Sequence, residues 1–440
     1  MYRKTVKFTP EDIEVFKDKL LSWAQQFEEV AWLDSNNYHR RYSSFDSIMA
    51  FDALTSIQTD TYDAFEKLKE YQSVSHDWLF GYLSYDLKND VENLKSGNFD
   101  GLEFPDLYFF QPKKIVTIKE GVAEFHYLPM VDDEVEADYE EINSFQESST
   151  YETGNTGDVK IKLRIHKEEY MAKVKKMLDY IHRGDIYEAS FCQEFYAEDT
   201  ELAPLRSYKH LNEISKPPFA TYLKIRDQYL LSASPERYLR KEGSKVLSQP
   251  IKGTAKRAQF LKADVQLVNS LRNNPKERSE NIMIVDLVRN DLSRVAKKGT
   301  VEVEELCKVY TFEQVHQLIS TVKAIVPDET NPIDIIKATF PMGSMTGAPK
   351  ISAMKIIEEL EETKRGLYSG TVGYFTPVGD FDFNVVIRSI LYNATKKYIS
   401  YSVGGAITAR SIPEKEYEEC LIKAKAMREV LEGKLNNQKV

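Results

Sequence analysis

The stretch Gly370-Thr-Val-Gly-Tyr-Phe-Thr376 is the first of three strand-like runs that follow one another near the end of this 440-residue chain. The other two runs are residues 383–392 and 398–403, and the pattern beyond them predicts a closing helix over residues 414–432. Strands grouped in this way are typical of antiparallel sheets rather than of strict strand–helix alternation. The Gly-x-Gly-x-x-Gly fingerprint is also absent, so a Rossmann fold is disfavoured.

Upstream of this stretch the chain continues as a mixture of predicted helices and strands. Apolar spacing predicts helices at residues 11–27 and 167–182, strands at 107–112, 114–119 and 186–195, a hairpin across 229–247, a helix-rich stretch up to residue 295 and a helix opened by Pro349. We therefore predict an α+β fold with a large antiparallel, sandwich-like sheet core and helices packed outside it.

One break in composition divides the chain. Residues 131–159 contain no Lys or Arg, whereas Asp and Glu accumulate there beside Ser, Thr, Gly and Asn. We interpret this segment as an exposed acidic connection between an N-terminal α/β part, residues 1–150, and a second part, residues 160–440. The alternative is a solvated loop with no role of its own.

Charge and cysteine usage exclude several classes of protein. Asp and Glu outnumber Lys and Arg by 69 to 59, and the resulting net charge of −10 disfavours nucleic-acid binding. Cys192, Cys307 and Cys420 are widely separated, which argues against a disulfide framework and a zinc site. No long apolar run and no secretory start are present, so we expect a cytoplasmic protein without a membrane partner.

Two pairs of glutamates stand at helical spacing. Glu277 and Glu280 precede an apolar run, and Glu416 and Glu419 lie in the predicted closing helix. A spacing of three residues puts each pair on one helix face, and Lys423 extends the second face by one turn. Two such faces that meet would offer hard oxygen ligands to Mg²⁺. The alternative is a solvated acidic stripe in which Glu419 pairs with Lys423.

Three further features are candidates for chemistry. Gly343-Ser-Met-Thr-Gly-Ala-Pro-Lys350 places free backbone N–H groups at a helix start, which favours an anion, although it also fits a capped turn and is not a P-loop. Lys252 lies in Pro250-Ile-Lys-Gly-Thr254, where desolvation would make its amine a nucleophile; the alternative is a surface lysine. Glu236 is an ordinary turn acid unless it lies beside Lys252.

The order of these motifs along the chain closely resembles that of the chorismate-utilising enzymes. The matching motifs are Ser234-Pro-Glu-Arg237, Pro250-Ile-Lys-Gly-Thr254, residues 280–291, Gly343–Lys350, Arg365-Gly-Leu-Tyr-Ser-Gly370 and Ile387-Arg-Ser389. The family includes component I of anthranilate synthase and of aminodeoxychorismate synthase, as well as isochorismate and salicylate synthases. The resemblance covers residues 167–432 and implies the fold of anthranilate synthase component I.

Within the family, Lys252 and Ser344 resemble the pattern of aminodeoxychorismate synthases, and anthranilate synthase component I is the alternative. Glu188 departs from the pattern, because the amine-transferring members usually carry glutamine there and the isochorismate synthases a water-activating lysine. Ala255-Lys-Arg257 also replaces the usual continuation of its motif. Leu33-Asp-Ser35 resembles the tryptophan-binding motif only weakly, so we do not predict feedback inhibition.

The resemblance implies how chorismate, a dianion, would be bound. Mg²⁺ would be held by Glu280 and Glu419, with Glu277 and Glu416 as direct or water-mediated partners. The remaining substrate-binding groups would be Ser344, Tyr368, Arg388, the Gly404 backbone and Lys423.

The resemblance also implies the reaction. Lys252 would attack C2 of chorismate, Glu236 and His316 would donate protons, and ammonia would then give 4-amino-4-deoxychorismate, the precursor of p-aminobenzoate for folate. Because no cysteine sits in a glycine-rich nucleophile turn, ammonia would come from a separate glutamine amidotransferase subunit. A regulatory subunit without chemistry is an alternative of another class, and Lys252, Glu236 and both glutamate pairs disfavour it.

Overall fold

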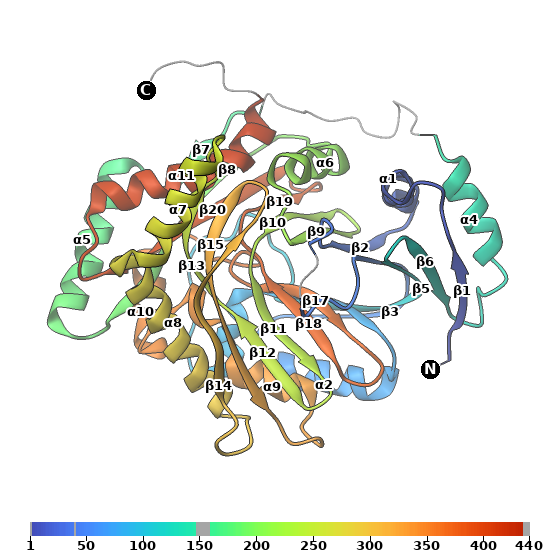
Figure 1. Ribbon diagram of the computed structural model, residues 1–440, viewed down its shortest axis with the longest axis horizontal. Coiled ribbons are helices and arrows are strands. Elements are labelled where there is room, and N and C mark those ends of the chain that lie inside the picture. The colour runs from blue at the N-terminus through green and yellow to red at the C-terminus, as the bar shows by residue number, and fades with distance from the viewer. Residues whose placement is uncertain (1, 39–40, 147–158, 434–440) are drawn as a thin grey trace.

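The computed structural model describes residues 2–38, 41–146 and 159–433. Its core is a pair of β-sheets that share two long strands, β3 (Ser47–Thr59) and β5 (Leu107–Lys119), whose pairing shifts register between Ala53 and Thr55. This irregularity increases local twist, so the two halves of each strand enter different sheets. The predicted α+β fold with a large antiparallel sheet is confirmed (Figure 1).

The first sheet extends from the halves of β3 and β5 toward both ends of the molecule. Its remaining strands are β1 (Lys4–Phe8), β6 (Val122–Tyr127), β2 (Glu29–Asp34), β9 (Phe219–Ile225), β10 (Gln228–Ser234), β19 (Ser389–Asn393), β20 (Tyr398–Thr408), β8 (Glu188–Ala197), β7 (Lys162–Leu163) and β16 (Gly347–Ala348). Every pair of neighbours is antiparallel.

The second sheet packs against one face of the first. Its strands are β4 (Leu79–Leu83), β17 (Thr371–Phe375), β18 (Phe381–Val385), β11 (Arg237–Glu242), β12 (Lys245–Gln249), β15 (Val315–Ile325), β13 (Ile251–Lys256) and β14 (Glu302–Thr311). Leu223, Leu230 and Leu391 of the first sheet join Phe109 and Phe383 of the second in one buried apolar cluster. Burial of such a cluster is the main force that holds the two sheets together.

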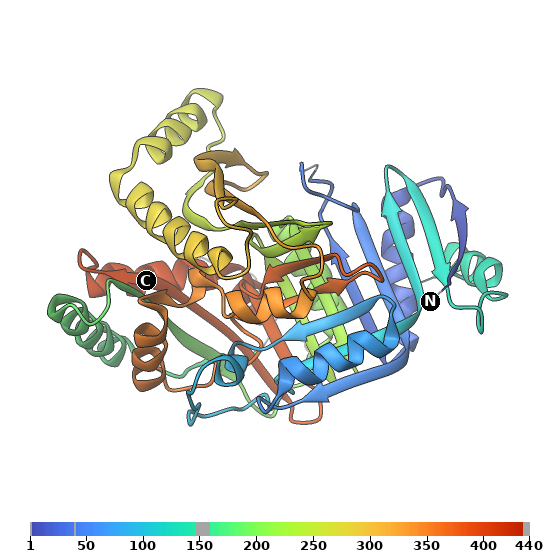
Figure 2. The same ribbon diagram turned by 90° about the horizontal axis from the view of Figure 1, so that it is seen from below.

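Helices cover the outer faces (Figures 1 and 2). The apolar cluster on the outer face of the first sheet includes side chains from α1 (Ile13–Trp23), α4 (Val135–Ser144), α5 (Lys167–Arg183), α6 (Pro204–Ser215), α10 (Lys350–Leu360) and α11 (Pro413–Glu432). The remaining helical segments are η1 (Ala24–Gln26), α2 (Ala64–Ser75), η2 (Tyr85–Leu87), α3 (Lys88–Val91), α7 (Leu261–Asn273), α8 (Pro275–Ser293), α9 (Pro332–Thr339) and η3 (Gly343–Met345). No helix of the described residues is long and apolar enough to cross a membrane.

Three details differ from the prediction. The run 383–392 is not one strand, because Arg388 adopts φ +54° and separates β18 from β19. The runs 107–112 and 114–119 form the single strand β5. Within the predicted hairpin 229–247, β10 instead pairs with β9 and β19, and only β11 and β12 form a hairpin.

The acidic segment is partly structured. Residues 135–144 form α4, most of whose side chains are exposed, although the side chain of Asp138 is buried against Lys114 and Tyr127. Residues 147–158 lie outside the described residues. Strands from both sides of this segment pair with each other, β2 with β9 and β4 with β17, so the sheets run through both parts of the chain. Their division into 1–150 and 160–440 stays a prediction.

Candidate functional site

Two helix starts bring the four predicted glutamates into one electrostatic environment, which we call the acidic cluster: Glu277, Glu280, Glu416 and Glu419. Helix α8 begins where Asn274 accepts hydrogen bonds from the N–H groups of residues 276 and 277, and Pro275 occupies the first helical position. The carboxylate of Glu419 on α11 raises the pKa of Glu277 on α8, so the two helices face the same space.

Glycines allow strands to approach this cluster closely. A Cβ at Gly405 of β20 would lie 3.4 Å from Glu416 Oε2 and 3.8 Å from Glu419 Oε1. A Cβ at Gly253 of β13 would lie 3.0 Å from Glu277 Oε2, and Gly253 has φ +95°. The acidic cluster therefore lies between α8, α11 and the ends of these two strands.

Burial disfavours negative charge in the cluster. It raises the pKa of Glu280 to about 7 and also raises the pKa of Glu277 and Glu416. Burial acts in the same direction on Glu419, but the Lys423 ammonium, 2.7 Å from Glu419 Oε1, holds the pKa of Glu419 below its usual value. The cluster is thus short of positive charge.

The chemistry of the cluster fits a hard divalent cation. Carboxylate oxygens from two helices are the ligands that Mg²⁺ prefers. In the described part of the chain, however, no three His, Cys, Asp or Glu side chains are arranged around one point as a metal site. Instead, Lys276 Nζ lies 3.8 Å from Glu280 Oε1, and the positive charge of Lys276 lowers the pKa of all four glutamates against the effect of burial.

Lys252 and Glu236 lie next to this cluster. The charge of Lys252 lowers the pKa of Glu236, Glu280 and Glu419 against the effect of burial, so its ammonium faces all three. Among the described residues, the Lys252 side chain has no ion pair or hydrogen bond within contact distance. Burial raises the pKa of Glu236 to about 7, although this carboxyl accepts hydrogen bonds from the Ser344 hydroxyl and the Ile251 N–H. A small cavity lined by Glu236, Ser344 and Pro250 adjoins the pair.

The predicted anion-binding residues meet where β8, β20 and α11 join. Lys423 Nζ donates to the Gly404 carbonyl at 2.7 Å, and Tyr368 donates to Cys192 Sγ at 3.6 Å. Arg388 is half-buried within electrostatic reach of Tyr368 and Glu419, and desolvation lowers its pKa. Gly404 has no room for a side chain, since a Cβ would lie 2.3 Å from the Phe191 carbonyl oxygen.

His316 lies apart from these groups. Its Nδ1 is 2.9 Å from Thr311 Oγ1 and its Nε2 is 2.9 Å from Asp264 Oδ1, so both ring nitrogens are occupied. Asp264 is also paired with Arg257. The structure gives His316 no hydrogen bond or ion pair with any other predicted site residue.

Two features of the site were missed from the sequence: the alignment of Ser190 and Cys192 with Glu188, which the resemblance had already singled out, and the position of Lys276. Strand β8 presents Glu188, Ser190 and Cys192 at alternate positions; Lys252 opposes the burial-induced rise in the pKa of Glu188, and Ser190 donates to the Ser344 carbonyl at 3.3 Å. Glu188 Oε2 is buried and has no hydrogen-bond partner among the residues that the structure describes. The period of two along a strand was the available signal. The position of Lys276 among the four glutamates had no signal beyond its place in the first turn of α8.

Comparison with known proteins shows to which family the chain belongs. The profile of the chorismate binding enzymes matches residues 28–429. This chain belongs to that family.

Individual relatives are similar over most of the chain. An anthranilate synthase component I-like protein of Synechocystis is 36% identical over 362 residues, which cover 81% of this chain and 73% of that protein. Aminodeoxychorismate synthase component 1 of Salmonella typhimurium is 40% identical over 265 residues, 60% of this chain and 58% of that protein. The crystal structure of anthranilate synthase component I from Streptococcus pneumoniae superposes with a TM-score of 0.77 at 25% identity and covers 89% of this chain and 94% of that one.

Proposed function

We propose that this chain is the aminating component of an aminodeoxychorismate synthase, which adds ammonia to chorismate and forms 4-amino-4-deoxychorismate. The observation that carries the proposal is the pair formed by Lys252 and Glu236. An ammonium without an ion-pair partner faces a buried carboxyl group whose pKa is raised to about 7. Such a pair offers a nucleophile, once Lys252 has lost its proton, beside a proton donor.

The acidic cluster is the proposed site of Mg²⁺. Glu280 and Glu419 would hold the ion, and Glu277 and Glu416 would hold it directly or through water. When bound, Mg²⁺ supplies positive charge that offsets the carboxylates of both protein and substrate and favours departure of an oxygen. The glutamates whose pKa is raised by burial would then keep their charge.

The cationic end of the site is proposed to bind a chorismate carboxylate. Arg388 offers a planar fork for two parallel hydrogen bonds, and Lys423 already donates to the backbone beside it at Gly404. Tyr368 adds a hydroxyl donor to the same region. Lys423 is free to exchange its bond to Glu419 for a substrate carboxylate once a cation occupies the acidic cluster.

The reaction is proposed to proceed in two substitutions. After the Lys252 ammonium has released its proton to solvent, the neutral Lys252 amine forms a bond to C2 while the two ring double bonds shift and the C4 oxygen leaves as water with a proton from Glu236. Ammonia then forms a bond to C4, both double bonds shift back, the Lys252 amine leaves C2, and the Glu236 carboxylate takes the proton that the new amine loses. A covalent nucleophile divides one difficult substitution into two easier ones. We propose no role for His316 in these steps, because both of its ring nitrogens are occupied.

The ammonia is proposed to come from a separate glutamine amidotransferase. The Salmonella typhimurium relative is named component 1 of its synthase, and that name implies a second component.

A product assay tests the proposed function. Purified protein is incubated with chorismate, Mg²⁺ and ammonium salt, with and without an aminodeoxychorismate lyase. We expect p-aminobenzoate only when the lyase is added. Fluorescent anthranilate released without the lyase would instead show an anthranilate synthase, the activity named for the relatives from Synechocystis and Streptococcus pneumoniae.

A further inference from the structure

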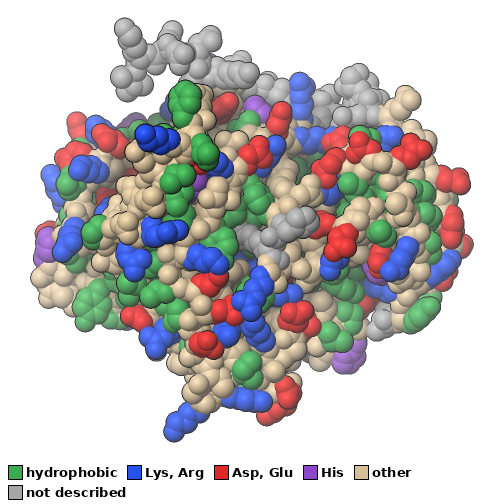
Figure 3. Space-filling model, in the orientation of Figure 1, with side chains coloured by type: hydrophobic (Ala, Val, Ile, Leu, Met, Phe, Trp, Pro, Cys, Tyr) green, Lys and Arg blue, Asp and Glu red, His purple; other side chains and the backbone are tan. Residues whose placement is uncertain are grey.

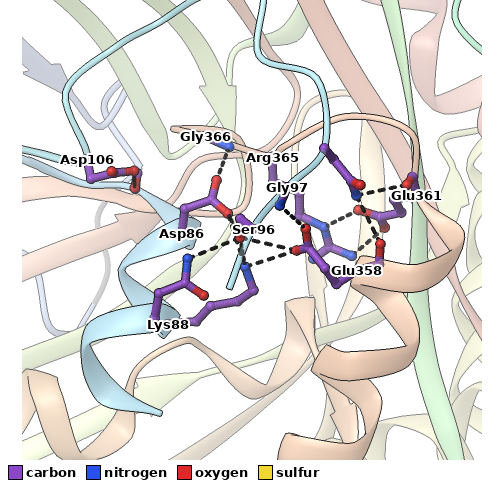
Figure 4. Close-up of polar contacts among 12 residues, drawn as sticks. Asp86, Lys88, Ser96, Gly97, Asp106, Glu358, Glu361, Arg365 and Gly366 are labelled. Carbon is purple, nitrogen blue, oxygen red and sulfur yellow. Dashed lines mark hydrogen bonds and ion pairs between the residues drawn. The ribbon is translucent and has the colours of Figure 1, made fainter. Parts of the chain in front are cut away.

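A network of buried charges ties the N-terminal part of the chain to the segment that carries Tyr368. We call it the paired network: Asp86, Lys88, Glu358, Glu361 and Arg365 (Figure 4). Asp86 and Lys88 come from η2 and α3, whereas the other three come from α10 and the loop that follows it. Asp86 and Lys88 are almost fully buried, with 3% and 1% of their surfaces exposed.

Asp86 makes the central contact of the network. Its Oδ2 accepts the Gly366 N–H at 2.9 Å, and its Oδ1 accepts hydrogen bonds from Ser96 at 2.7 Å and Lys88 at 3.1 Å (Figure 4). In return, the Tyr85 N–H donates to the Gly366 carbonyl at 2.8 Å. Gly366 has φ +55°, so these two bonds fix the backbone at the point where it turns.

Arg365, the residue before this turn, contacts residues that line the site. Its guanidinium lies 4.4 Å from the centre of the Tyr85 ring and pairs with both oxygens of Glu361 at 2.7 and 2.9 Å. It also donates to the carbonyl of Met345, the neighbour of Ser344, and to the carbonyl of Ser190 on β8. The Arg365 side chain therefore connects two segments of the chain that line the site, one at Met345 and one at Ser190.

Glu361 and the residues after Gly366 complete the connection. Glu361 Oε1 accepts the Cys192 N–H at 2.9 Å, and Cys192 Sγ is the partner of Tyr368. Gly370 packs so closely on the N-terminal part that a Cβ there would lie 2.3 Å from the Leu83 carbonyl oxygen. Tyr368 thus lies on a short segment that the N-terminal part holds near both of its ends, at Gly366 and Gly370.

We propose that Asp86 is a positioning residue for the substrate site, an inference that rests on the proposed function. By accepting the Gly366 N–H in a buried place, Asp86 holds the segment 366–370 in the conformation that aims Tyr368 at Cys192 and Arg388. The N-terminal part would then contribute to substrate binding without touching the substrate. Its effect is on chorismate binding rather than on the chemical steps, because Lys252 and Glu236 lie outside the network.

The test compares Asp86→Ala with Asp77→Ala in ammonia-dependent turnover of chorismate. Asp77 is a matched control, because it is a buried carboxylate of the same part, 2% exposed, and pairs with Arg3 and Gln111 away from the site. Loss of a charged, buried hydrogen bond is expected to raise KM for chorismate about tenfold in Asp86→Ala, with kcat within about twofold of the parent. Asp77→Ala is expected to lower Tm but keep the parent KM.

Other outcomes decide against the inference. If Asp86→Ala has the same KM for chorismate as the parent protein, the inference is overturned. An equal rise of KM in Asp86→Ala and Asp77→Ala also overturns it, because it would show general destabilisation. If Asp86→Ala does not fold, Asp86→Asn decides, because it keeps the volume but loses the charge: a several-fold rise of KM supports the inference and an unchanged KM overturns it.

A second readout separates this inference from the proposed function. Amide hydrogen exchange in Asp86→Asn is expected to become faster at residues 366–370 but not in β17, whether or not chorismate is the substrate. Unchanged exchange at 366–370 overturns the inference even if the product assay supports the proposed function. Conversely, a parent protein that does not bind chorismate refutes the proposed function, and the exchange data still show whether Asp86 holds the segment.

Discussion

The acidic cluster and the paired network are both groups of buried or half-buried charges, yet they are organised in opposite ways. In the paired network Glu361 uses both carboxylate oxygens, and Arg365 uses all three of its nitrogens, in bonds to Glu361, Ser190 and Met345. In the acidic cluster, among the described residues, no donor lies within hydrogen-bond distance of the Glu277 carboxylate, and Glu280 has only Lys276 at 3.8 Å.

This difference separates charges that support the structure from charges that are available to a ligand. A buried charge without a partner destabilises the folded state, whereas a paired one maintains a unique geometry at little net gain. Burial raises the pKa of Glu277, Glu280 and Glu416, and it also raises the pKa of the paired Glu361, so the bonds and not the pKa values distinguish the two groups. We infer that the unpaired carboxylates of the acidic cluster destabilise the folded protein but allow it to bind a cation. The paired network instead holds the site in place. Both signs of charge are interspersed on the face of the molecule drawn in Figure 3.

The largest expected effect concerns Lys252, the cation that faces the acidic cluster without a bond to it. Lys252→Ala is expected to lower the amination rate with ammonia on the order of 10²-fold or more, as loss of a positioned catalytic group usually does. Lys252→Arg is not expected to restore activity, because a guanidinium stays protonated. Mass spectrometry of the parent protein is expected to show a covalent adduct with chorismate. Near-parent rates in Lys252→Ala without any adduct would favour direct attack by ammonia.

The paired network is expected to respond to the loss of one charge by losing stability. Glu361→Gln removes one partner of a buried ion pair and is expected to lower the free energy of unfolding by about 3–5 kcal/mol. Glu359→Gln is the matched control on the same helix, where an exposed pair with Lys176 is expected to contribute less than about 1 kcal/mol. Denaturant titration of both variants measures the difference. Equal effects would contradict the distinction between buried and exposed pairs.

Glu236 is expected to make stability depend on pH. Its pKa is about 7 in the folded protein and near 4.5 when unfolded, so its contribution to stability is complete below pH 4.5 and is lost as pH rises through 7. The free energy of unfolding of the parent, measured relative to Glu236→Gln, is therefore expected to fall by about 3 kcal/mol between pH 4.5 and pH 8. A constant difference across this range would show that Glu236 titrates normally. Because Glu236 must be protonated to act as a proton donor, turnover is also expected to decline above pH 7.

In the acidic cluster, replacement of a glutamate is expected to act in the direction opposite to Glu361→Gln. Glu280→Gln removes a charge that burial disfavours, so the metal-free variant is expected to be more stable than the parent at pH 8 by on the order of 2 kcal/mol. In the presence of Mg²⁺ the order is expected to reverse, because only the parent gains stability by binding the ion. Thermal unfolding with EDTA and with Mg²⁺ measures both. If the metal-free variant is instead less stable than the parent, the charge of Glu280 stabilises the fold and the prediction is wrong.

The sequence predicted those parts of the site that depend on local spacing. Glu277 with Glu280 and Glu416 with Glu419 were recognisable because each pair has the i, i+3 spacing of one helix face. The sheet-rich fold and the family resemblance were also predicted from the sequence and are confirmed. Both rest on motifs that are continuous in the chain.

Contacts between distant residues were beyond such reasoning. The bond from Tyr368 to Cys192 joins residues 176 positions apart, and the bond from Asp86 to Gly366 joins residues 280 positions apart. The break between β18 and β19 at Arg388 was not predicted, because a residue with positive φ is usually glycine and residue 388 is an arginine. His316 was grouped with the site by its motif, but tertiary contacts pair it with Asp264.

Titration calorimetry of chorismate with and without Mg²⁺ tests most directly the claim that the acidic cluster binds a cation for the substrate. We expect chorismate to bind the parent protein in Mg²⁺, and we expect its affinity to fall at least tenfold in EDTA and in Glu280→Gln with Mg²⁺ present. Glu359→Gln, a substitution of the same type outside the site, is expected to bind as the parent does. Equal affinity for chorismate in Mg²⁺ and in EDTA would contradict the account.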